Sequence, residues 1–164
     1  MRSRRAKFIS LGLVILMGIA SACSAGSAPV PDSRRPDLDQ LQGKWQLVYQ
    51  EMDGKKLPDE RQSEMFHGMM DISADKIYYQ VDLQGFDFEF SYRLHPDQHP
   101  KGIDLTLTKT PDGKGEGQTM LGIYRLKEGT LEICHSKTNR PSDFIAGKGS
   151  HQVLIVLKRV PNSR

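Results

Sequence analysis

In Phe86-Asp87-Phe88-Glu89-Phe90-Ser91-Tyr92-Arg93-Leu94, apolar and polar side chains alternate without a break. Successive side chains of a β-strand point to opposite faces, so this alternation predicts a strand with one buried face and one face in water. The same period of two recurs at Ile103–Leu107 and, less strictly, at Trp45–Tyr49. The pattern is typical of an antiparallel sheet that covers a core on one side.

Five further segments complete the predicted strands, and turn-forming residues separate them. These strands are Met69–Ser73, Ile77–Val81, Met120–Leu126, Thr130–His135 and Gln152–Val160. One short helix is predicted between the first two strands. There, Pro58 and the acidic pair Asp59 and Glu60 suit a first helical turn, and Gly68 suits the exit.

Eight short strands and one small helix fit either a closed antiparallel barrel or a two-sheet sandwich. A closed barrel leaves no exposed sheet edge and accommodates an eight-stranded meander joined by short connections. The sequence therefore favours an all-β fold, an eight-stranded antiparallel barrel over residues 38–160. Residues 161–164 are expected to form a short tail.

The N-terminus has the pattern of an export signal. Four basic residues within positions 1–7 precede a mostly apolar run from Phe8 to Ala20, which is too short to span a membrane. Ala20-Ser21-Ala22-Cys23 resembles the lipobox of bacterial lipoproteins, in which the cysteine is acylated. We therefore expect a signal peptide over residues 1–22, lipid on Cys23 and a lipid-anchored protein of the cell envelope, outside the cytoplasm.

Two alternatives to lipidation stay open at this point. An ordinary signal peptidase could cut after Ala22 and release a secreted protein, or the segment could stay uncleaved as an anchor. With lipidation, Ser24 leaves outer-membrane sorting open, because inner-membrane lipoproteins often carry an acidic residue there. Residues 23–37 contain Pro29, Pro31 and Pro36 and no apolar periodicity, so they are expected to form a flexible tether.

The charge of the chain gives no reason to expect nucleic-acid binding. The whole chain has 23 basic and 20 acidic residues, a net charge of +3. Removal of residues 1–22 takes away four basic residues and leaves 19 against 20, a net charge of −1. A nucleic-acid-binding domain is expected to carry a clustered basic face, and here the basic residues are scattered.

Several short motifs occur in a fixed order along the domain. They are Leu41-Gln42-Gly43-Lys44-Trp45, Asp53-Gly54, Ile103-Asp104-Leu105, Leu121-Gly122-Ile123-Tyr124, Thr130-Leu131-Glu132-Ile133-Cys134, Arg140-Pro141 with Phe144, and Val153-Leu154 through Arg159. Together they resemble an uncharacterised lipocalin-like domain family common in planctomycete-type bacteria. The resemblance covers residues 38–160. It implies a lipocalin-like barrel and no particular activity.

Gly43-Lys44-Trp45 also matches the G-x-W motif that opens the first strand of lipocalins. In that family a basic residue near the last strand packs over the tryptophan, and Lys158 or Arg159 occupies the corresponding place here. The resemblance therefore implies a structural role for Gly43, Trp45 and Arg159, which would close one end of the barrel.

Alternation places a set of aromatic side chains on the inner face of the barrel, either as core filling or as the wall of an apolar pocket. The set is Trp45, Tyr49, Tyr79, Phe86, Phe88, Phe90, Tyr92 and Tyr124. Ligand-binding candidates are the polar members Tyr49, Tyr79, Tyr92 and Tyr124, together with His135, a polar residue on an otherwise apolar face.

No catalytic or metal-binding set is predicted. Cys134 and His135 are neighbours on one strand and point to opposite faces, so the histidine cannot activate the thiol. Cys134 is expected to be a buried hydrophobic residue; a Cys23–Cys134 disulfide is the alternative only if Cys23 is not acylated. His95 and His99 lie in a proline-containing turn, which is a poor metal site. No cofactor is expected.

Three functions fit these observations. The leading one is a non-enzymatic binding or interaction module, tethered to a membrane, that takes a small apolar ligand or a protein partner. The second is a barrel enzyme, a hydrolase or isomerase, that uses His135 and a tyrosine such as Tyr124 for acid–base chemistry. The third is a purely structural envelope lipoprotein. The long connection that contains Arg140–Phe144 is expected to lie across a barrel opening as a lid.

Overall fold

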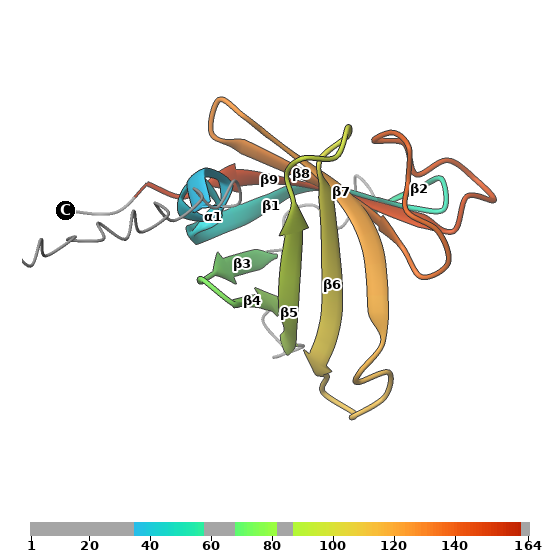
Figure 1. Ribbon diagram of the computed structural model, residues 1–164. Coiled ribbons are helices and arrows are strands. Elements are labelled where there is room, and N and C mark those ends of the chain that lie inside the picture. Colours follow the sequence, from blue (N-terminus) through green and yellow to red (C-terminus); the bar gives the residue numbers. More distant parts are fainter. Residues whose placement is uncertain (1–34, 58–67, 82–86, 162–164) are drawn as a thin grey trace, which may run out of the picture. The chain divides into compact units, whose positions relative to one another are not determined.

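The computed structural model describes residues 35–57, 68–81 and 87–161 (Figure 1). These ranges contain one helix and nine strands. The elements are α1 (Arg35–Leu41), β1 (Gly43–Met52), β2 (Lys55–Leu57), β3 (Met69–Ile72), β4 (Lys76–Gln80), β5 (Asp87–His95), β6 (Gly102–Lys109), β7 (Thr119–Lys127), β8 (Thr130–Ser136) and β9 (Gln152–Arg159). The expected signal peptide, Cys23 and most of the helix predicted from Pro58 onward fall outside the described residues.

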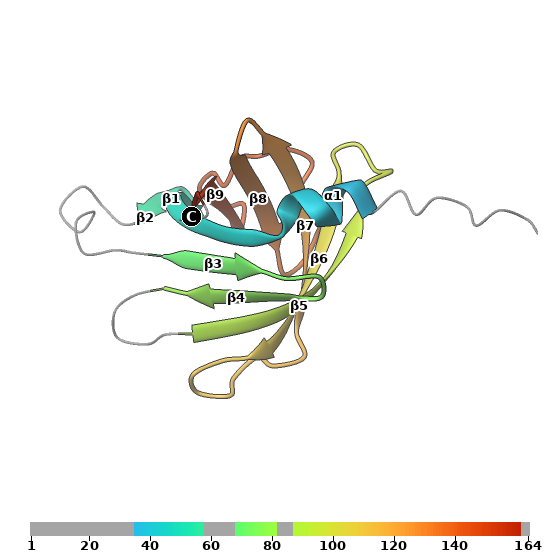
Figure 2. The same ribbon diagram turned by 90° about the vertical axis from the view of Figure 1, so that its left-hand side faces the viewer.

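Eight strands form a closed antiparallel barrel, which confirms the predicted fold class. From β3 to β9 each strand pairs with the next, and β1 pairs with both β3 and β9, so the sheet closes on itself. Figure 2 shows β3, β4 and β5 side by side on one wall of this barrel. The extra strand, β2, forms a hairpin with the end of β1. All eight strands expected from the alternation are present.

The described helix, α1, lies directly before the first strand. The sequence analysis assigned residues up to 37 to a flexible tether, whereas α1 begins at Arg35. Pro36 and Asp37 suit a first helical turn. Leu41, at the end of the helix, is 1% exposed, and Leu38 packs against the same core. The segment is therefore a helix that docks on the barrel. None of the helical segments in the described ranges is long and apolar enough to cross a membrane.

A β-bulge in β1 reverses the direction of its side chains. Leu47 is paired with Leu157 and Tyr49 with Val156, so Val48 is an extra residue on β1. Before the bulge, Leu47 lies in the barrel core. After it, Tyr49 packs with a cluster on the outside of the barrel. This bulge decides which side chains of β1 reach the interior.

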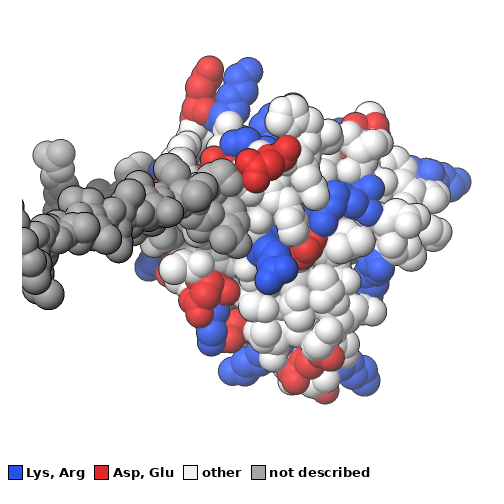
Figure 3. Space-filling view, in the orientation of Figure 1, with Lys and Arg blue, Asp and Glu red and all other residues white. Residues whose placement is uncertain are grey.

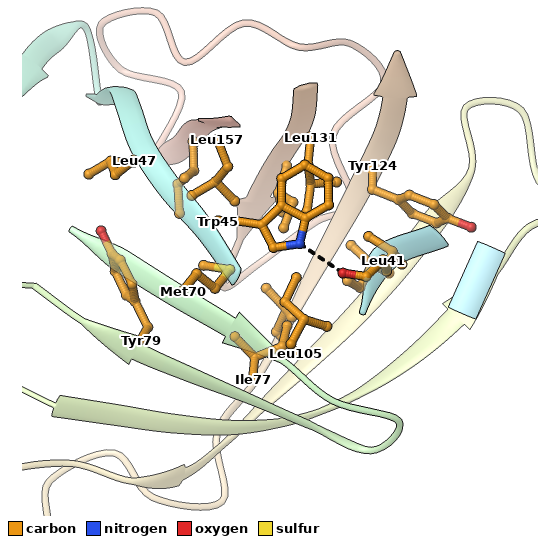
Figure 4. Packing of buried hydrophobic residues seen from close by; sticks show 14 of the residues in the cluster. Leu41, Trp45, Leu47, Met70, Ile77, Tyr79, Leu105, Tyr124, Leu131 and Leu157 are labelled. Carbon is orange, nitrogen blue, oxygen red and sulfur yellow. Dashed lines mark hydrogen bonds between the residues drawn. The ribbon is translucent and has the colours of Figure 1, made fainter. Parts of the chain in front are cut away.

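Trp45 fills the part of the barrel beneath α1 and is completely buried (Figure 4). Its indole Nε1 donates a hydrogen bond to the Leu41 carbonyl at 2.8 Å. The Arg159 guanidinium lies 4.2 Å from the centre of the Trp45 ring and donates to the carbonyls of Gln40 and Gln42. Gly43 has φ +114, and a Cβ there would lie 3.2 Å from Arg159. Glycine, tryptophan and arginine together hold the helix end against β1 and β9.

A buried carboxylate fixes the start of α1 to the barrel. Asp37 accepts two hydrogen bonds from Lys101 Nζ, at 2.8 and 3.0 Å, and a third from the Tyr124 hydroxyl. Burial, and then this contact with Asp37, raise the pKa of Tyr124 far above its ordinary value. The phenol therefore stays protonated and acts as a hydrogen-bond donor. This contact joins residues that are 87 positions apart in the sequence.

Replacing Tyr124 by phenylalanine is expected to lower the free energy of unfolding by ~1.5–3 kcal/mol, the range for a hydrogen bond to a charged group. Urea unfolding followed by circular dichroism measures the change. Tyr92→Phe is the matched control, because the Tyr92 hydroxyl donates at 2.6 Å to the uncharged carbonyl of Ser73 and is exposed. Equal losses in the two variants would contradict a special role for Asp37.

The connection between β8 and β9 packs on the outer face of the barrel. Ala146 is fully buried against Ile123 and Cys134, and its carbonyl accepts a hydrogen bond from the Gly54 amide. Arg140 donates to Asp104 at 2.5 Å and to the carbonyls of Ile103 and Gly122. The connection is therefore fixed along the wall formed by β6 to β9.

Candidate functional site

The barrel encloses a cavity of about 420 Å³, to which all eight barrel strands contribute side chains. This barrel cavity is lined by Gln50, Met52, Met70, Ile77, Tyr79, Val81, Phe88, Phe90, Leu105, Met120, Ile133, His135, Val153 and Ile155. Its volume lies within the range of ~300–1,000 Å³ typical of small-molecule sites. The cavity lies away from α1: in Figure 4, Tyr79 and Leu41 lie on opposite sides of Trp45.

Three described side chains bring polar atoms to the otherwise apolar wall of the barrel cavity. They are Gln50, Tyr79 and His135. The Tyr79 hydroxyl donates a long hydrogen bond, 3.4 Å, to Gln50 Oε1. Burial raises the pKa of Tyr79 to about 12, so this hydroxyl is uncharged at neutral pH. Polar groups that are few and convergent on an apolar wall are typical of ligand pockets.

His135 is the polar residue of the cavity with no hydrogen-bond partner among the described residues. It lies on the inner face of β8, directly across from Gly122 on β7 and Val153 on β9. Burial, helped by the positive charge of Lys137, lowers the pKa of His135 to about 4. At neutral pH the imidazole is therefore uncharged and offers one N–H donor and one nitrogen acceptor.

Gly122 faces His135 across the β7–β8 pair, and its lack of a side chain leaves room for the imidazole. A Cβ built at Gly122 would lie 3.1 Å from the Cβ of His135 and 3.0 Å from the Cys134 carbonyl oxygen. Both distances are shorter than ordinary contacts, so a side chain here would press on the histidine and on the backbone of β8. The glycine on the inner face of β7 thus keeps room for the imidazole beside the cavity.

The structure brings together two of the five predicted ligand-binding residues, Tyr79 and His135. Tyr49 does not line the cavity, because the bulge at Val48 turns it to the outer face, where its hydroxyl donates to Glu51 at 2.6 Å. The placement of Tyr49 on the inner face was therefore wrong. Tyr92 packs against the core and Tyr124 is buried in it, but neither lines the cavity and their hydroxyls are bonded elsewhere.

Cys134 and His135 do point to opposite faces. Cys134 is fully buried on the outside of β8, with its Sγ 3.6 Å from Gln152 Oε1. Burial raises the pKa of the Cys134 thiol to about 11, so it is protonated at neutral pH. This residue behaves as a small buried hydrophobic group and is not part of the cavity.

The predicted lid does not cover the barrel cavity. No residue of the connection 137–151 lines it, because Arg140 and Ala146 hold this connection to the outer wall. The lid was predicted from the length of the connection alone. The hydrogen bonds that fix the connection to β6 and β7 join residues distant in the sequence, so no local sequence pattern predicts them.

Most of the non-aromatic residues that line the cavity were not singled out from the sequence. Among them are Gln50, Met52, Met70 and Met120, a glutamine and three methionines. Gln50 and Met52 reach the interior only because the bulge shifts the alternation of β1. Met70 and Met120 could have been found from the sequence, because each lies on the same face of its strand as a core residue. Met70 is two positions before Ile72, and Met120 is four positions before Tyr124. Met52 is also 44% exposed, which places it at an opening of the cavity.

His95 pairs with a carboxylate on the barrel wall. Its Nε2 lies 2.7 Å from Asp104 Oδ2, and Arg140 binds the other oxygen. Burial raises the pKa of Asp104, but the hydrogen bonds from His95 and Arg140 outweigh this effect and hold it below its usual value. Within the described ranges, no three His, Cys, Asp or Glu residues are grouped so as to hold a metal ion.

No protein-family model matches the chain, and no curated protein or solved structure is similar enough to count as a match. The features that bear on function are therefore the apolar wall of the barrel cavity, the polar atoms that three described residues bring to it, and the glycine that faces His135.

Proposed function

We propose that this protein is a non-enzymatic binding module that holds a small, largely apolar molecule in the barrel cavity. The observation that carries the proposal is a cavity of about 420 Å³ with a largely apolar wall, to which three of the described residues bring polar atoms. An apolar ligand in such a site loses contact with water, at ~25 cal/mol per Å² of buried apolar surface. A barrel packed solid with side chains would offer no such gain.

The residue types that line the barrel cavity also favour a ligand-binding site over a core that only stabilises the barrel. Met52, Met70 and Met120 line the cavity beside the aromatic rings of Phe88 and Phe90. Methionine side chains are flexible and polarisable, so they adapt to the shape of a ligand. The two phenylalanine rings are stacked, with their centres 6.5 Å apart, and present a rigid apolar surface.

The alternative of a barrel enzyme is weakened by the pKa values of the cavity. An efficient general acid or base has a pKa near the working pH. Burial instead moves the pKa of His135 down to about 4 and that of Tyr79 up to about 12. The second proposed acid–base group, Tyr124, is engaged with Asp37 beneath α1. These groups are suited to hydrogen bonding with a ligand at neutral pH.

We further propose that the barrel is exported and held at a membrane by lipid on Cys23, with residues 24–34 as the spacer. The signal pattern of residues 1–22 and the lipobox-like Ala20–Cys23 support this location. Lipid bilayers dissolve the same small apolar molecules that suit the barrel cavity. Figure 3 shows basic and acidic side chains interspersed on the face in view, which gives no support to nucleic-acid binding.

Val153→Phe is expected to weaken binding of N-phenylnaphthylamine by about tenfold or more, because a larger side chain then occupies the site. Val153 lines the cavity across from His135. The fluorescence of the probe in a titration gives its dissociation constant. Val48→Phe is the matched control, since Val48 is 54% exposed and lies outside the cavity. Equal affinities in the wild type and both variants, or no binding at all, would refute the proposal.

Cys23→Ser is expected to move the protein from the membrane fraction to the soluble extract of the envelope, since the acyl chains supply the anchoring energy. Fractionation followed by intact-mass measurement checks the result. The wild-type chain should begin at Cys23 and carry acyl mass. A Cys23→Ser protein that stays in the membrane fraction would argue for an uncleaved anchor instead.

A further inference from the structure

We infer that the ligand of the barrel cavity is an uncharged amphipath: an apolar body with one neutral hydrogen-bonding group, such as a hydroxyl, placed against His135. Carboxylates and ammonium ions of the same shape are rejected. This inference rests on the proposed function and names the class of molecule that the site takes. It follows from the charge, the hydrogen bonding and the size of the cavity.

The described lining of the barrel cavity offers no charged side chain that could receive an ion. None of its described lining residues is Lys, Arg, Asp or Glu. Lys137, whose positive charge acts on His135, is exposed and does not line the cavity. A carboxylate moved from water to an apolar site without a partner is disfavoured far more strongly than a neutral polar group. The same holds for an ammonium ion. Charge alone therefore excludes fatty acids and amines in their ionised forms.

The hydrogen-bonding groups of the wall nevertheless require a polar partner. His135 has no partner among the described residues, and the bond between Tyr79 and Gln50 is long, at 3.4 Å. Neutral histidine and the amide of Gln50 each offer a donor and an acceptor. A purely hydrocarbon ligand would leave these groups unpaired in an apolar site, which is costly. A hydroxyl can both donate and accept, so it satisfies them.

The volume of the cavity sets the size of the apolar body. A cavity of ~150 Å³ lined by apolar side chains is large enough to bind benzene. At about 420 Å³, the barrel cavity takes a molecule larger than one aromatic ring. Met52 lies at its opening, while Ile133 and Ile155 lie deeper, 1% and 6% exposed. The apolar body would pack against these and the aromatic side chains.

A series of ligands with the same ring system tests the inference directly. Naphthalene, naphthol and naphthoate differ only in the substituent. Each is titrated by calorimetry at neutral pH into the full chain in mild detergent and, as a blank that is subtracted, into the same detergent solution without protein. Naphthol is expected to bind ~10-fold or more tightly than naphthoate, because the site offers no partner for the ion. Naphthalene is expected to bind with an affinity between these two. Equal or tighter binding of naphthoate would overturn the inference.

Two variants of His135 identify the group that recognises the hydroxyl. In His135→Leu, the preference for naphthol over naphthalene is expected to fall by ~5-fold or more, since the leucine cannot hydrogen-bond. His135→Gln, which keeps a neutral donor and acceptor, should retain most of the preference. A preference unchanged in His135→Leu would contradict the assignment. If none of the three ligands binds, the proposed function fails; if all bind equally, only the inference fails.

Discussion

Trp45→Ala is expected to destabilise the barrel by ~3–5 kcal/mol, the usual loss when a buried tryptophan or phenylalanine is truncated to alanine. Trp45 is completely buried, its indole donates to the Leu41 carbonyl, and the Arg159 guanidinium lies over its ring. Truncation removes the packing, the indole hydrogen bond and the surface on which the arginine lies. Because domains of this size are stable by only ~5–15 kcal/mol, a loss of this size is a large fraction of the total.

Urea unfolding followed by circular dichroism measures this effect. Tryptophan fluorescence is unsuitable, because Trp45 is the only tryptophan in the chain. Trp45→Phe provides the control: it keeps an aromatic ring under Arg159 but loses the bond to Leu41, so a smaller loss is expected. If Trp45→Ala unfolds within about 1 kcal/mol of the wild type, the residue does not hold α1 and the barrel together as described.

Lowering the pH from about 6.5 to about 4 is expected to remove roughly 3 kcal/mol of stability through His135 alone. The pKa of His135 in the folded protein is about 4, and its ordinary value is 6.5. Between these values the unfolded chain binds a proton that the folded protein does not. The stability from the neutral, buried imidazole is therefore complete above pH 6.5 and is lost as the pH falls towards 4.

The difference between the wild type and His135→Gln isolates this contribution. Glutamine does not titrate, so the free energy of unfolding of the variant should fall less steeply between pH 6.5 and 4. The carboxylates with lowered pKa, such as Asp104, are present in both proteins and cancel in the comparison. Parallel stability curves for the two proteins would show that the imidazole is not held in an apolar environment.

Much of the barrel could be predicted from the sequence because its clearest strands alternate regularly. The alternation of β5 and β6 by itself requires one buried face, and the remaining strands follow from shorter apolar segments that turn-forming residues separate. The resemblance also pointed to Trp45 and Arg159, which the structure places 4.2 Å apart. The local sequence pattern was sufficient to predict a strand and its buried face wherever the strand was regular.

The errors have specific physical causes. A single extra residue at Val48 moved Tyr49 to the outer face and brought Gln50 into the cavity, and alternation cannot reveal a bulge. Residues 35–37, the first turn of α1, were taken for tether because a proline and two charged residues make up this turn, although Asp37 is buried against the barrel. The contacts of Asp37 with Lys101 and Tyr124 link residues far apart in sequence, so no local pattern predicts them.

The most direct measurement of the central claim is a titration followed by the methyl signals of the methionines in nuclear magnetic resonance spectra. Met52, Met70 and Met120 line the barrel cavity, whereas Met69, the neighbour of Met70 on β3, does not. When N-phenylnaphthylamine is added, the signals of the three cavity methionines should shift together, with one dissociation constant, and that of Met69 should stay in place. If these three signals do not move, or if Met69 alone responds, the barrel does not bind its ligand in this cavity.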